Sequence, residues 1–560
     1  MQGAGAVLLA VCSSTDAGLG AGGDADIFFT ISHDHGVTWN PPALLPTLFI
    51  PDGTAEDIEP SFGSKTGANM IVWASTQSSP NGTHDIFSAH GSVDGSSWVN
   101  PFPVGLLSLG ADTIEDRLPT VVGSGLTFVC AWQRNDGSDT DIWFSRTTGN
   151  GGPRWSAATP LQSNAGTDDG RDAHVRLATD GTGKWVAVWT SQATLGGTIG
   201  NDSDVLFARS TDDGVTWSAP AALNTTAFSD PLAQDFRPVI AIDKASGVWI
   251  TAWTSTNTLG GTIGSDEDIL FARSTNGGAT WSAPLALDLD AATDSNLTSD
   301  YDVSPCIEAD QVGHFVCVWE RTRGGSEYDI AGARSDDLGL TWGPPVLVNT
   351  NAATDVGQDQ VPRIIADGTG HWTAAWNSTE SLGGSNGTDG DVLSTRFMIP
   401  SSVAGVATRY CFGYRESGNP SPCPCANAAV IGSAQGCRNS TGTGAAVTFL
   451  DAPSVSAATR LITGSSVVPG AGTLFFQGLG QANFGIGTPF GDGLLSVGGT
   501  IIRLGVAFAS GSGQALLTFV PIGVAPGAVR FYQGWYRDTG ATCGGGLFNL
   551  TSAVAVTWTP

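Results

Sequence analysis

The sequence predicts an all-β protein: a seven-bladed β-propeller in residues 1–400, followed by a smaller disulfide-containing β-domain in residues 401–560. Three observations predict this fold. Strand-like segments recur with a spacing of about 60 residues over the first part of the chain, and glycine-rich turns separate them. Glycine and proline together make about 19% of the chain, against a usual ~12%. Cysteines cluster after residue 410, where the repeat has ended.

The repeat is clearest in two successive units, 174–223 and 237–287. Each alternates apolar and polar residues and is broken by Asp-Gly or Gly-Gly, a pattern typical of strands joined by hairpins. A tryptophan in the second strand recurs in six of the units, at Trp73, Trp132, Trp189, Trp253, Trp319 and Trp376. Four short strands per unit at this spacing predict propeller blades, which bury their faces only against neighbouring blades.

The number of blades follows from a second repeated residue. An aspartate opens the third strand of every unit, at Asp26, Asp85, Asp141, Asp204, Asp268, Asp329 and Asp391. This count predicts seven blades. Residues 6–13 align with the second strand of the later units, so we expect the chain to begin without an innermost first strand. We also expect an N-terminal segment with a signal peptide to be missing.

The turn after the third strand carries a resemblance to a known family. Ser32–Trp39, Ser210–Trp217 and Ser335–Trp342 match the pattern Ser-x-Asp-x-Gly-x-x-Trp in full, and Ser274–Trp281 replaces the aspartate by asparagine. This pattern resembles the Asp box, or BNR repeat, of the sialidase superfamily, over roughly residues 1–400. The resemblance implies a structural turn between the third and fourth strands, away from the active face. Six-bladed rings are the norm in that superfamily, so six blades are the alternative to seven.

The charge of the chain excludes several partners. Asp and Glu number 52 against 24 Lys and Arg, which gives a net charge of −28. Nucleic acid and anionic membrane surfaces need a basic stripe, and the sequence has none. No apolar run is as long as a membrane-spanning helix requires, so we expect no membrane insertion. A glycan, an extracellular protein or Ca²⁺ remains as the partner, and we expect a monomer.

The second domain is predicted from its cysteines and strands. Clustered cysteines in a glycine-rich span favour disulfides in a secreted or cell-surface protein, here Cys411, Cys423, Cys425, Cys437 and Cys543. Zinc is the alternative, although no histidine follows residue 371. The segments 490–493, 532–538 and 548–551 resemble a β-domain that recurs in secreted bacterial proteins, for which attachment or secretion is the implied role.

Two propeller cysteines are expected to face each other. Cys306 and Cys317 flank a hairpin that we expect to turn at residues 310–313 with a two-residue loop. This register places the two side chains opposite one another. A cross-strand disulfide and two buried thiols are the alternatives.

A second set of aspartates precedes the first strand of six units, at Asp57, Asp116, Asp172, Asp235, Asp302 and Asp359. We expect these side chains to share one rim of the ring with the third-strand aspartates. They can cap turns or hydrogen-bond to backbone N–H groups. Some can instead bind Ca²⁺, and the residues that we predict as metal ligands are Asp202, Asp204, Asp266 and Asp268.

Arginines interrupt the repeat and are therefore candidates for function. Arg117-Leu118-Pro119 resembles the sialidase element whose arginine holds the carboxylate of sialic acid, and Arg237 and Arg363 lie at similar strand positions. Bidentate pairing with a carboxylate explains the need for arginine. These three residues are predicted as an arginine triad. Further residues near them are predicted to bind ligand: Arg171, Arg176, Asp116, Asp172 and Asp235. Pairing of the arginines with the aspartate rim is the alternative.

The catalytic residues that the resemblance implies are harder to place. Sialidases use a tyrosine activated by a glutamate, with an aspartate as acid or base. Tyr301 and Asp302 are the candidates, with Glu59 or Glu308 as the partner of Tyr301; packing is the alternative role for Tyr301.

Two functions remain. Because no motif places the tyrosine and the glutamate together, the sequence favours a non-catalytic module that binds a glycan or a protein. A sialidase-like glycoside hydrolase that removes terminal sugars is the alternative. An exposed rim of aspartates would repel an anionic sugar, so we expect a neutral glycan.

Overall fold

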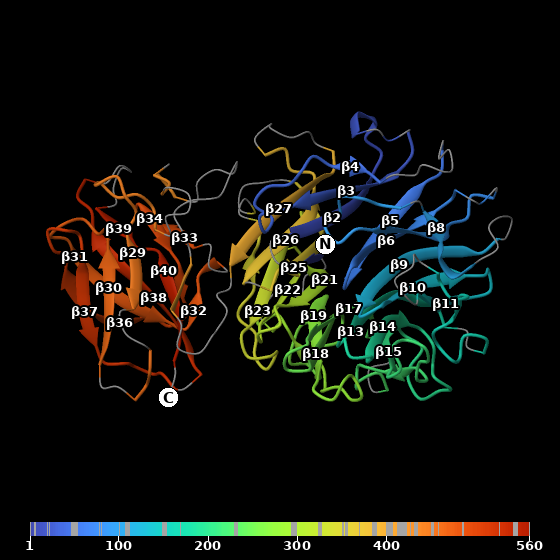
Figure 1. The fold of residues 1–560 in the computed structure, drawn as a ribbon. Coiled ribbons are helices and arrows are strands. Elements are labelled where there is room, and N and C mark those ends of the chain that lie inside the picture. The colour runs from blue at the N-terminus through green and yellow to red at the C-terminus, as the bar shows by residue number, and fades with distance from the viewer. Residues whose placement is uncertain are drawn as a thin grey trace. The chain divides into compact units, whose positions relative to one another are not determined.

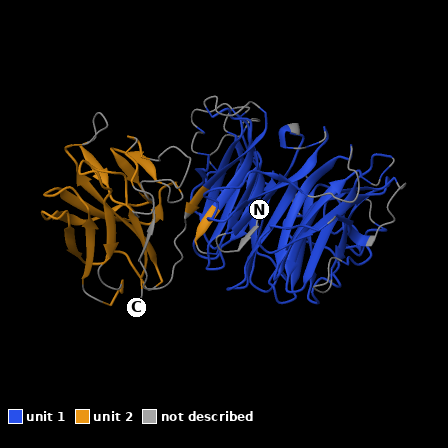
Figure 2. Cartoon of the chain, turned by 45° about the horizontal axis from the view of Figure 1, so that its top comes forward, with its two compact units in different colours: residues 1–368, 373–395 blue, residues 369–372, 396–560 orange. Residues whose placement is uncertain are grey.

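The computed structural model confirms an all-β chain, and the chain divides into two compact units, residues 1–368 with 373–395 and residues 369–372 with 396–560 (Figures 1 and 2). The helical segments among the described residues are the short 3-10 turns η1 (Ala17–Leu19) and η2 (Val104–Leu106). Neither has the length or the apolar character that a membrane span requires. The structure describes residues 2–558 except 5–6, 20, 22, 46–53, 78, 80, 100, 107–112, 148–153, 168–169, 229–232, 293–299, 323–326, 350–351, 353–356, 369, 383–388, 399–406, 411–422, 426, 430–434, 450–452, 457–458, 484–486, 526 and 541–546.

In its described residues the first unit contains seven antiparallel sheets, in which strands that follow each other in the chain lie side by side. The first three are β1 (Gln2–Ala4), β2 (Val7–Ser14), β3 (Asp26–Ser32) and β4 (Ala43–Leu44); β5 (Asp57–Lys65), β6 (Ala68–Ser75), β7 (Asp85–Gly91) and β8 (Phe102–Pro103); and β9 (Glu115–Ser124), β10 (Thr127–Asn135), β11 (Thr140–Arg146) and β12 (Thr159–Pro160).

The next two sheets are β13 (Asp172–Thr179), β14 (Trp185–Ser191), β15 (Asp204–Ser210) and β16 (Ala221–Ala222); and β17 (Asp235–Asp243), β18 (Val248–Ser255), β19 (Asp268–Ser274) and β20 (Leu285–Ala286). The last two are β21 (Tyr301–Ala309), β22 (Phe315–Thr322), β23 (Asp329–Ser335) and β24 (Val346–Leu347); and β25 (Asp359–Ala366), β26 (His371–Ser378) and β27 (Asp391–Met398). These sheets are the seven predicted blades, numbered here 1 to 7.

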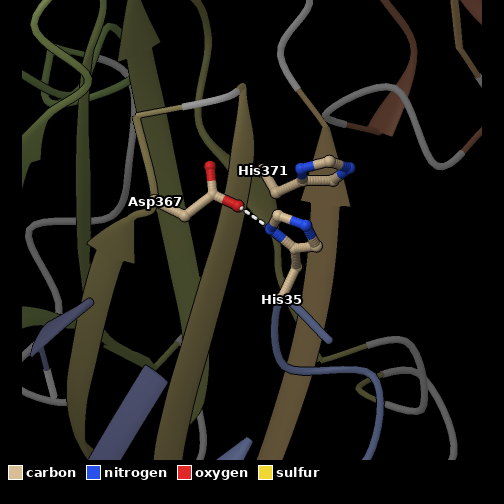
Figure 3. A group of neighbouring side chains, drawn as sticks. All are labelled: His35, Asp367 and His371. Carbon is tan, nitrogen blue, oxygen red and sulfur yellow. Dashed lines mark hydrogen bonds and ion pairs between the residues drawn. The ribbon is translucent and has the colours of Figure 1, made fainter. Parts of the chain in front are cut away.

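The ring closes between the first and the last blade. The first strands of successive blades lie against each other, and β1 lies against both β5 and β25. His35 Nδ1 of blade 1 is 2.5 Å from Asp367 Oδ2 of blade 7 (Figure 3). The prediction that the chain begins without an innermost strand is wrong, because β1 pairs with β2 at Gln2↔Leu9 and Ala4↔Val7. A strand as short as β1 is too brief to show an alternating pattern, which is why it was missed.

The predicted Asp boxes lie between the third and fourth strands of their blades. In blade 4, Ser210 Oγ donates to Asp212 Oδ1 (2.7 Å), which in turn accepts the Thr216 N–H (2.9 Å). The tryptophan at the end of the box packs against a third-strand phenylalanine of the preceding blade, as Trp217 does against Phe144. The box therefore closes a turn and also fastens two blades together.

The glycine of the box is needed for both backbone and space. Gly339 has φ +73°, a conformation that residues with a side chain rarely adopt. A Cβ atom at this position would lie 2.1 Å from Ile250 Cδ1 of the preceding blade. The box can therefore approach its neighbour only with glycine here.

Cys306 and Cys317 do not lie opposite each other. The register pairs Cys306 with Val318 and Ile307 with Cys317, and both cysteines are free thiols. The turn is one residue longer than expected because Asp310 closes it, with its N–H donating to the His314 carbonyl and its Oδ1 accepting the His314 N–H. The longer turn slips the register by one residue, and the cross-strand disulfide is excluded.

The second unit is built from antiparallel sheets around its own core. One sheet contains β28 (Ala407–Tyr410), β40 (Ala553–Thr557), β38 (Val529–Arg537), β31 (Gly472–Gly478) and β36 (Ile502–Phe508), with β39 (Phe548–Leu550) on β38. The others contain β29 (Ala446–Phe449), β30 (Arg460–Ser465) and β37 (Ala515–Phe519); β32 (Gly480–Gln481) and β35 (Val497–Gly498); and β33 (Thr488–Phe490) and β34 (Gly493–Leu495).

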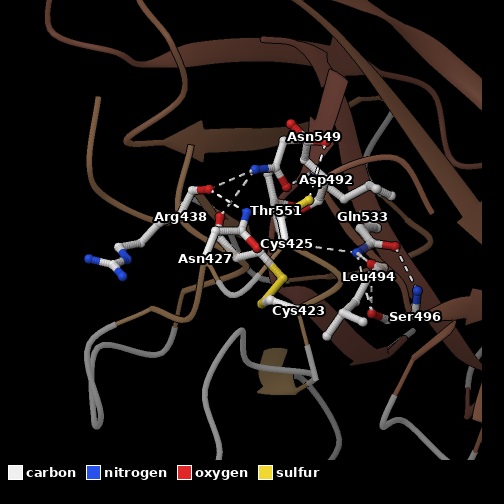
Figure 4. The surroundings of a disulfide bond; sticks show 12 residues. Cys423, Cys425, Asn427, Arg438, Asp492, Leu494, Ser496, Gln533, Asn549 and Thr551 are labelled. Atoms are coloured by element: carbon white, nitrogen blue, oxygen red, sulfur yellow. Dashed lines mark hydrogen bonds between the residues drawn. A yellow bond between two sulfur atoms is a disulfide. The ribbon is translucent and has the colours of Figure 1, made fainter. Parts of the chain in front are cut away.

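A disulfide joins Cys423 to Cys437 in this unit, as the cysteine cluster predicted (Figure 4). Cys425 is also disulfide-bonded. Cys411 and Cys543 lie outside the described residues. The core holds its polar groups in a chain of hydrogen bonds: Trp558 Nε1 donates to Tyr532 Oη (3.0 Å), which donates to Gln477 Oε1 (2.9 Å).

Candidate functional site

The first strands of blades 2 to 7 share a backbone feature that positions the candidate residues. Each has a buried aspartate near its start and a residue in the left-handed region two positions later, with φ between 50° and 57°. These left-handed residues are Glu59, Leu118, His174, Arg237, Ser304 and Val361. In blades 2 to 6 the strand register shifts at the same place, so these strands carry a bulge at this end of the ring. The backbone repeats while the side chains vary, which is the arrangement expected of a binding surface on a fixed scaffold.

Side chains of the preceding blade hold several of these left-handed residues. The Arg237 N–H donates to Thr190 Oγ1 (3.0 Å), and the Ser304 N–H donates to Thr254 Oγ1 (3.2 Å). The Val361 N–H donates to Glu320 Oε1 (2.8 Å). Strain at these positions is thus supported by contacts between blades.

The first-strand aspartates are buried beneath this end and do not form an exposed rim. Asp172, Asp235 and Asp302 each accept the indole N–H of the second-strand tryptophan of their own blade, at 3.0, 2.9 and 2.8 Å. Asp116 pairs with Arg134 through two hydrogen bonds of 2.6 and 2.7 Å. All four are at most 1% exposed.

This burial corrects several predictions. Asp116, Asp172 and Asp235 cannot touch a ligand at the surface, and Asp302 cannot serve as an acid or base for a substrate there. The expectation of a neutral glycan also loses part of its premise, since the first-strand aspartates do not face the solvent. The sequence could not show this, because the partners of these aspartates lie on the next strand, more than a full strand length away along the chain.

Arg117 is neutralised by glutamates. Its Nε and Nη2 donate to the two oxygens of Glu59 (3.1 and 2.6 Å), and its Nη1 donates to Glu115 Oε1 (3.2 Å). Glu59 Oε2 also accepts the Leu118 N–H (2.7 Å). Arg117 is therefore paired with acidic side chains, which was the alternative to its role in an arginine triad. Its partners are glutamates and not the predicted aspartates.

The other arginines gather around His174. Burial, followed by the charges of Arg176, Arg237 and Arg171, lowers the pKa of His174 to about 4. The pKa of Arg176 is lowered to about 10 by burial and by the charge of Arg363. Arg171, Arg237 and Arg363 are exposed and Arg176 is half-buried. His174 Nδ1 accepts or donates no hydrogen bond within the described part of the chain. The four arginines and His174 are called the arginine cluster below.

A family model matches part of the ring. The model described as "BNR repeat-like domain" covers residues 126–366, which run from β10 to β25. The propeller is sialidase-like. No curated protein matches the chain.

Several solved structures are similar at low identity. The GH93 α-L-arabinofuranosidase of Fusarium graminearum is 12% identical, with a TM-score of 0.37, over 61% of this chain and 93% of its own. The Hadza microbial sialidase Hz136 is 12% identical, with a TM-score of 0.37, over 63% and 71%. The leech intramolecular trans-sialidase is 12% identical, with a TM-score of 0.38, over 70% and 66%.

A tyrosine that the sequence did not single out lies beside the cluster. Burial, followed by the charges of Glu320 and Glu267, raises the pKa of Tyr328. Glu320 is 6% exposed, and burial raises its pKa. The charges of Arg237 and Arg363 lower the pKa of Glu320 by less than burial raises it. Tyr301, the predicted nucleophile, is half-buried and also contributes to the raised pKa of Tyr328. Tyr328 precedes the third strand, where no motif in the sequence marks a functional position.

The predicted calcium ligands fall into different settings. Asp204 Oδ1 accepts a hydrogen bond from Asn224 Nδ2 (2.8 Å). Asp202, two residues earlier in the chain, is also buried. The pKa of Glu267 is raised by burial and then by the charge of Asp266. Asp268 lies in a group with Asp288 and Asp302, whose oxygens are within 4.8 Å of one another.

Glu308 on β21 is a propeller glutamate whose pKa is raised to about 7. Burial is the main cause, and it outweighs the hydrogen bond from the Ala309 N–H (2.9 Å) and the charge of Lys244. Because the folded pKa lies above the ordinary 4.5, the folded state binds this proton more tightly than the unfolded state. The stability that this proton provides is complete below pH 4.5 and is lost as the pH rises through 7.

We expect Glu308→Gln to raise the free energy of unfolding at pH 8 by roughly 2 kcal/mol. The change in pKa from 4.5 to about 7 corresponds to roughly 3 kcal/mol, and the part of Glu308 that stays in contact with solvent reduces this figure. At pH 4 the variant and the wild type should be equally stable. Urea denaturation at both pH values measures the difference. An equal gain at both pH values would show that the effect does not come from the titration of Glu308.

Proposed function

We propose that the sialidase-like propeller binds a carboxylate-bearing glycan at the arginine cluster and does not cleave it. The observation that carries this proposal is the gathering of Arg171, Arg176 and Arg237 around His174, with Arg363 beside Arg176, in a chain with a net charge of −28. Like charges repel, so a cluster of this kind is stable only if an anion or nearby carboxylates offset it. Arg237 donates from Nη1 to Ser304 Oγ (2.6 Å), a neutral partner, and Glu320 and Glu267 are the carboxylates that its charge acts on.

The chemistry of the cluster suits a carboxylate. A guanidinium presents paired N–H donors that match the two oxygens of a carboxylate. His174 is neutral above about pH 4, so it can donate or accept a hydrogen bond to a sugar hydroxyl without adding charge. A sugar acid offers both kinds of group.

We propose that the glycan is not cleaved because the predicted catalytic residues are buried or already paired. Asp302 is fully buried and bound to Trp319 and Arg321, so it cannot reach a glycosidic oxygen. Arg117, the arginine in the sialidase-like element, is occupied by two glutamates. Neither residue is available in the role that the resemblance implies.

A glycoside hydrolase is the second candidate, and Tyr328 favours it. A tyrosine nucleophile requires a neighbouring base that accepts its proton. Tyr328 has Glu320 as such a neighbour, and Arg237 also acts on it. If the chain is a hydrolase, we propose Tyr328 and not Tyr301 as its nucleophile.

Arg237→Ala tests the binding proposal. We expect it to weaken binding of an acidic oligosaccharide such as 3′-sialyllactose by about 10- to 100-fold, because it removes one charged partner of a carboxylate. Isothermal titration with 3′-sialyllactose, a glucuronic-acid oligosaccharide and neutral lactose measures the change. Arg334→Ala is the matched control, since Arg334 lies on β23 and pairs with Asp336.

Three results would contradict the proposal. Equal affinity of the wild type for lactose and for the acidic sugars would exclude carboxylate recognition. Affinity unchanged in Arg237→Ala would place the site elsewhere. Release of sialic acid that is lost in Tyr328→Phe would establish the hydrolase instead.

The place of action is also a proposal. The disulfide of the second unit supports secretion or cell-surface exposure, where glycans and extracellular proteins are the available partners. We expect the chain to act there as a monomer.

A further inference from the structure

A side chain after the fourth strand links neighbouring blades at several junctions. Between blades 4 and 5, Asn224 Nδ2 donates to Asp204 Oδ1 (2.8 Å) and to Asp235 Oδ2 (2.6 Å). Asn349 joins Asp329 and Asp359 in the same way between blades 6 and 7, at 2.7 and 2.8 Å.

Gln162 joins Asp141 and Asp172 between blades 3 and 4. In each of these three junctions one amide group supplies two hydrogens to two carboxylates, one from each blade. The amide is the natural link because it carries no charge of its own.

The junction between blades 5 and 6 has an aspartate in this place. Asp288 lies between Asp268, which opens β19, and Asp302 of β21, and the three side chains are at most 1% exposed. Neither oxygen of Asp288 accepts a hydrogen bond from an N–H or a hydroxyl group in the part of the chain that the structure describes, and its carboxyl group lies against that of Asp302. A fully buried carboxylate without a donor is costly unless something else compensates it.

Arg321 compensates only part of this charge. Its guanidinium bonds to Asp302 (2.7 and 2.9 Å) and to Asp290 (3.0 Å), and it stands 3.7 Å from Asp288. Three carboxylates therefore share one guanidinium, and Asp268 lies beside two of them. Asp302 is satisfied by Arg321 and Trp319, and the excess negative charge falls on Asp288.

We propose that a divalent cation, Ca²⁺, binds between Asp268, Asp288 and Asp302 and replaces the amide link at this junction. A proton on Asp288 could bond to only one of its two neighbours, whereas a cation bonds to both, as the two amide hydrogens do elsewhere. Ca²⁺ takes carboxylate oxygens at about 2.3–2.6 Å, so its ligands lie within about 5 Å of one another. The three aspartates meet this condition, since one carboxylate oxygen from each lies within 4.8 Å of the other two.

The full chain, stripped with EDTA and dialysed, tests the proposal. We expect CaCl2 to raise the thermal midpoint of the wild type by roughly 5 °C at a hundredfold excess over its Kd. Asp288→Asn recreates the link of the neighbouring junctions, so it should fold and its midpoint should not respond to CaCl2. Elemental analysis should find one more calcium in the wild type than in this variant.

Asn224→Asp makes the opposite change at the junction between blades 4 and 5. It places a third carboxylate between Asp204 and Asp235, as Asp288 is placed between Asp268 and Asp302. We expect this variant to bind one additional calcium and to need it for full stability. If Asn224→Asp does not fold, Asp288→Asn still decides the question.

Two outcomes would overturn the proposal. A wild-type midpoint that does not respond to CaCl2, with Asp288→Asn more stable by the same margin with and without metal, would show that a proton compensates Asp288. A calcium response that persists in Asp288→Asn would place the cation at other residues.

Discussion

Asp235→Ala lowers the free energy of unfolding of the propeller by about 3–5 kcal/mol, the cost of breaking a buried charged network. The carboxylate accepts the Trp253 indole N–H (2.9 Å) and the Asn224 amide (2.6 Å), so its removal leaves two buried donors without an acceptor. Both the hydrogen bonds within blade 5 and the link to blade 4 are lost. Urea denaturation followed by tryptophan fluorescence measures the effect.

A control and a double variant make this prediction specific. Asp136 lies in an exposed turn, and we expect Asp136→Ala to cost less than about 1 kcal/mol. Trp253→Phe removes the indole donor, so part of the cost of Asp235→Ala should disappear in the Trp253→Phe background. A loss for Asp235→Ala no larger than that of Asp136→Ala would mean that the Asp–Trp pair does not hold the blade together.

Replacing both Cys423 and Cys437 by serine destabilises the second unit by about 3 kcal/mol. The disulfide joins residues with a sequence separation of 14, and a loop of this size restricts the unfolded chain by about that amount. Cys423 and Cys437 lie in a buried cluster with Phe476 and Leu550, so the serines also bury two hydroxyl groups. Hydrogen exchange of the full chain reports on this unit separately, because β31 and β38 are its central strands.

The matched control for the disulfide is Cys12→Ser, which replaces a free, half-buried cysteine of the propeller. We expect Cys12→Ser to leave exchange in β31 and β38 unchanged. Unchanged exchange in the Cys423→Ser, Cys437→Ser variant would show that the remaining contacts of this unit determine its stability without the bridge.

Much of the fold could be predicted from the sequence. The regularly spaced tryptophans, the aspartates that open the third strands and the Asp boxes all lie where the blades require them. These signals are local: a hairpin turn or an Asp box closes within a few positions of the chain, as Ser210 and Asp212 do. The same local rule failed for β1, and for Cys306 and Cys317, where one extra turn residue changed the register.

The site could be predicted only in part. Arginines at first-strand positions were expected to lie near one end of the ring, and Arg176, Arg237 and Arg363 share neighbours there. The sequence could not separate them from Arg117, because the pairing of Arg117 with Glu59 joins residues of two different blades. It also could not place Tyr328 or Asp288.

The sequence by itself determined the repeat, the number of blades and the turns, because these depend on residues close together in the chain. Only the tertiary structure decided which aspartates are buried, which arginines are exposed and where carboxylates meet without a donor. The physical reason is that the charge and solvation of a side chain depend on its neighbours in space. In a propeller those neighbours come from the next blade, a whole repeat away along the chain.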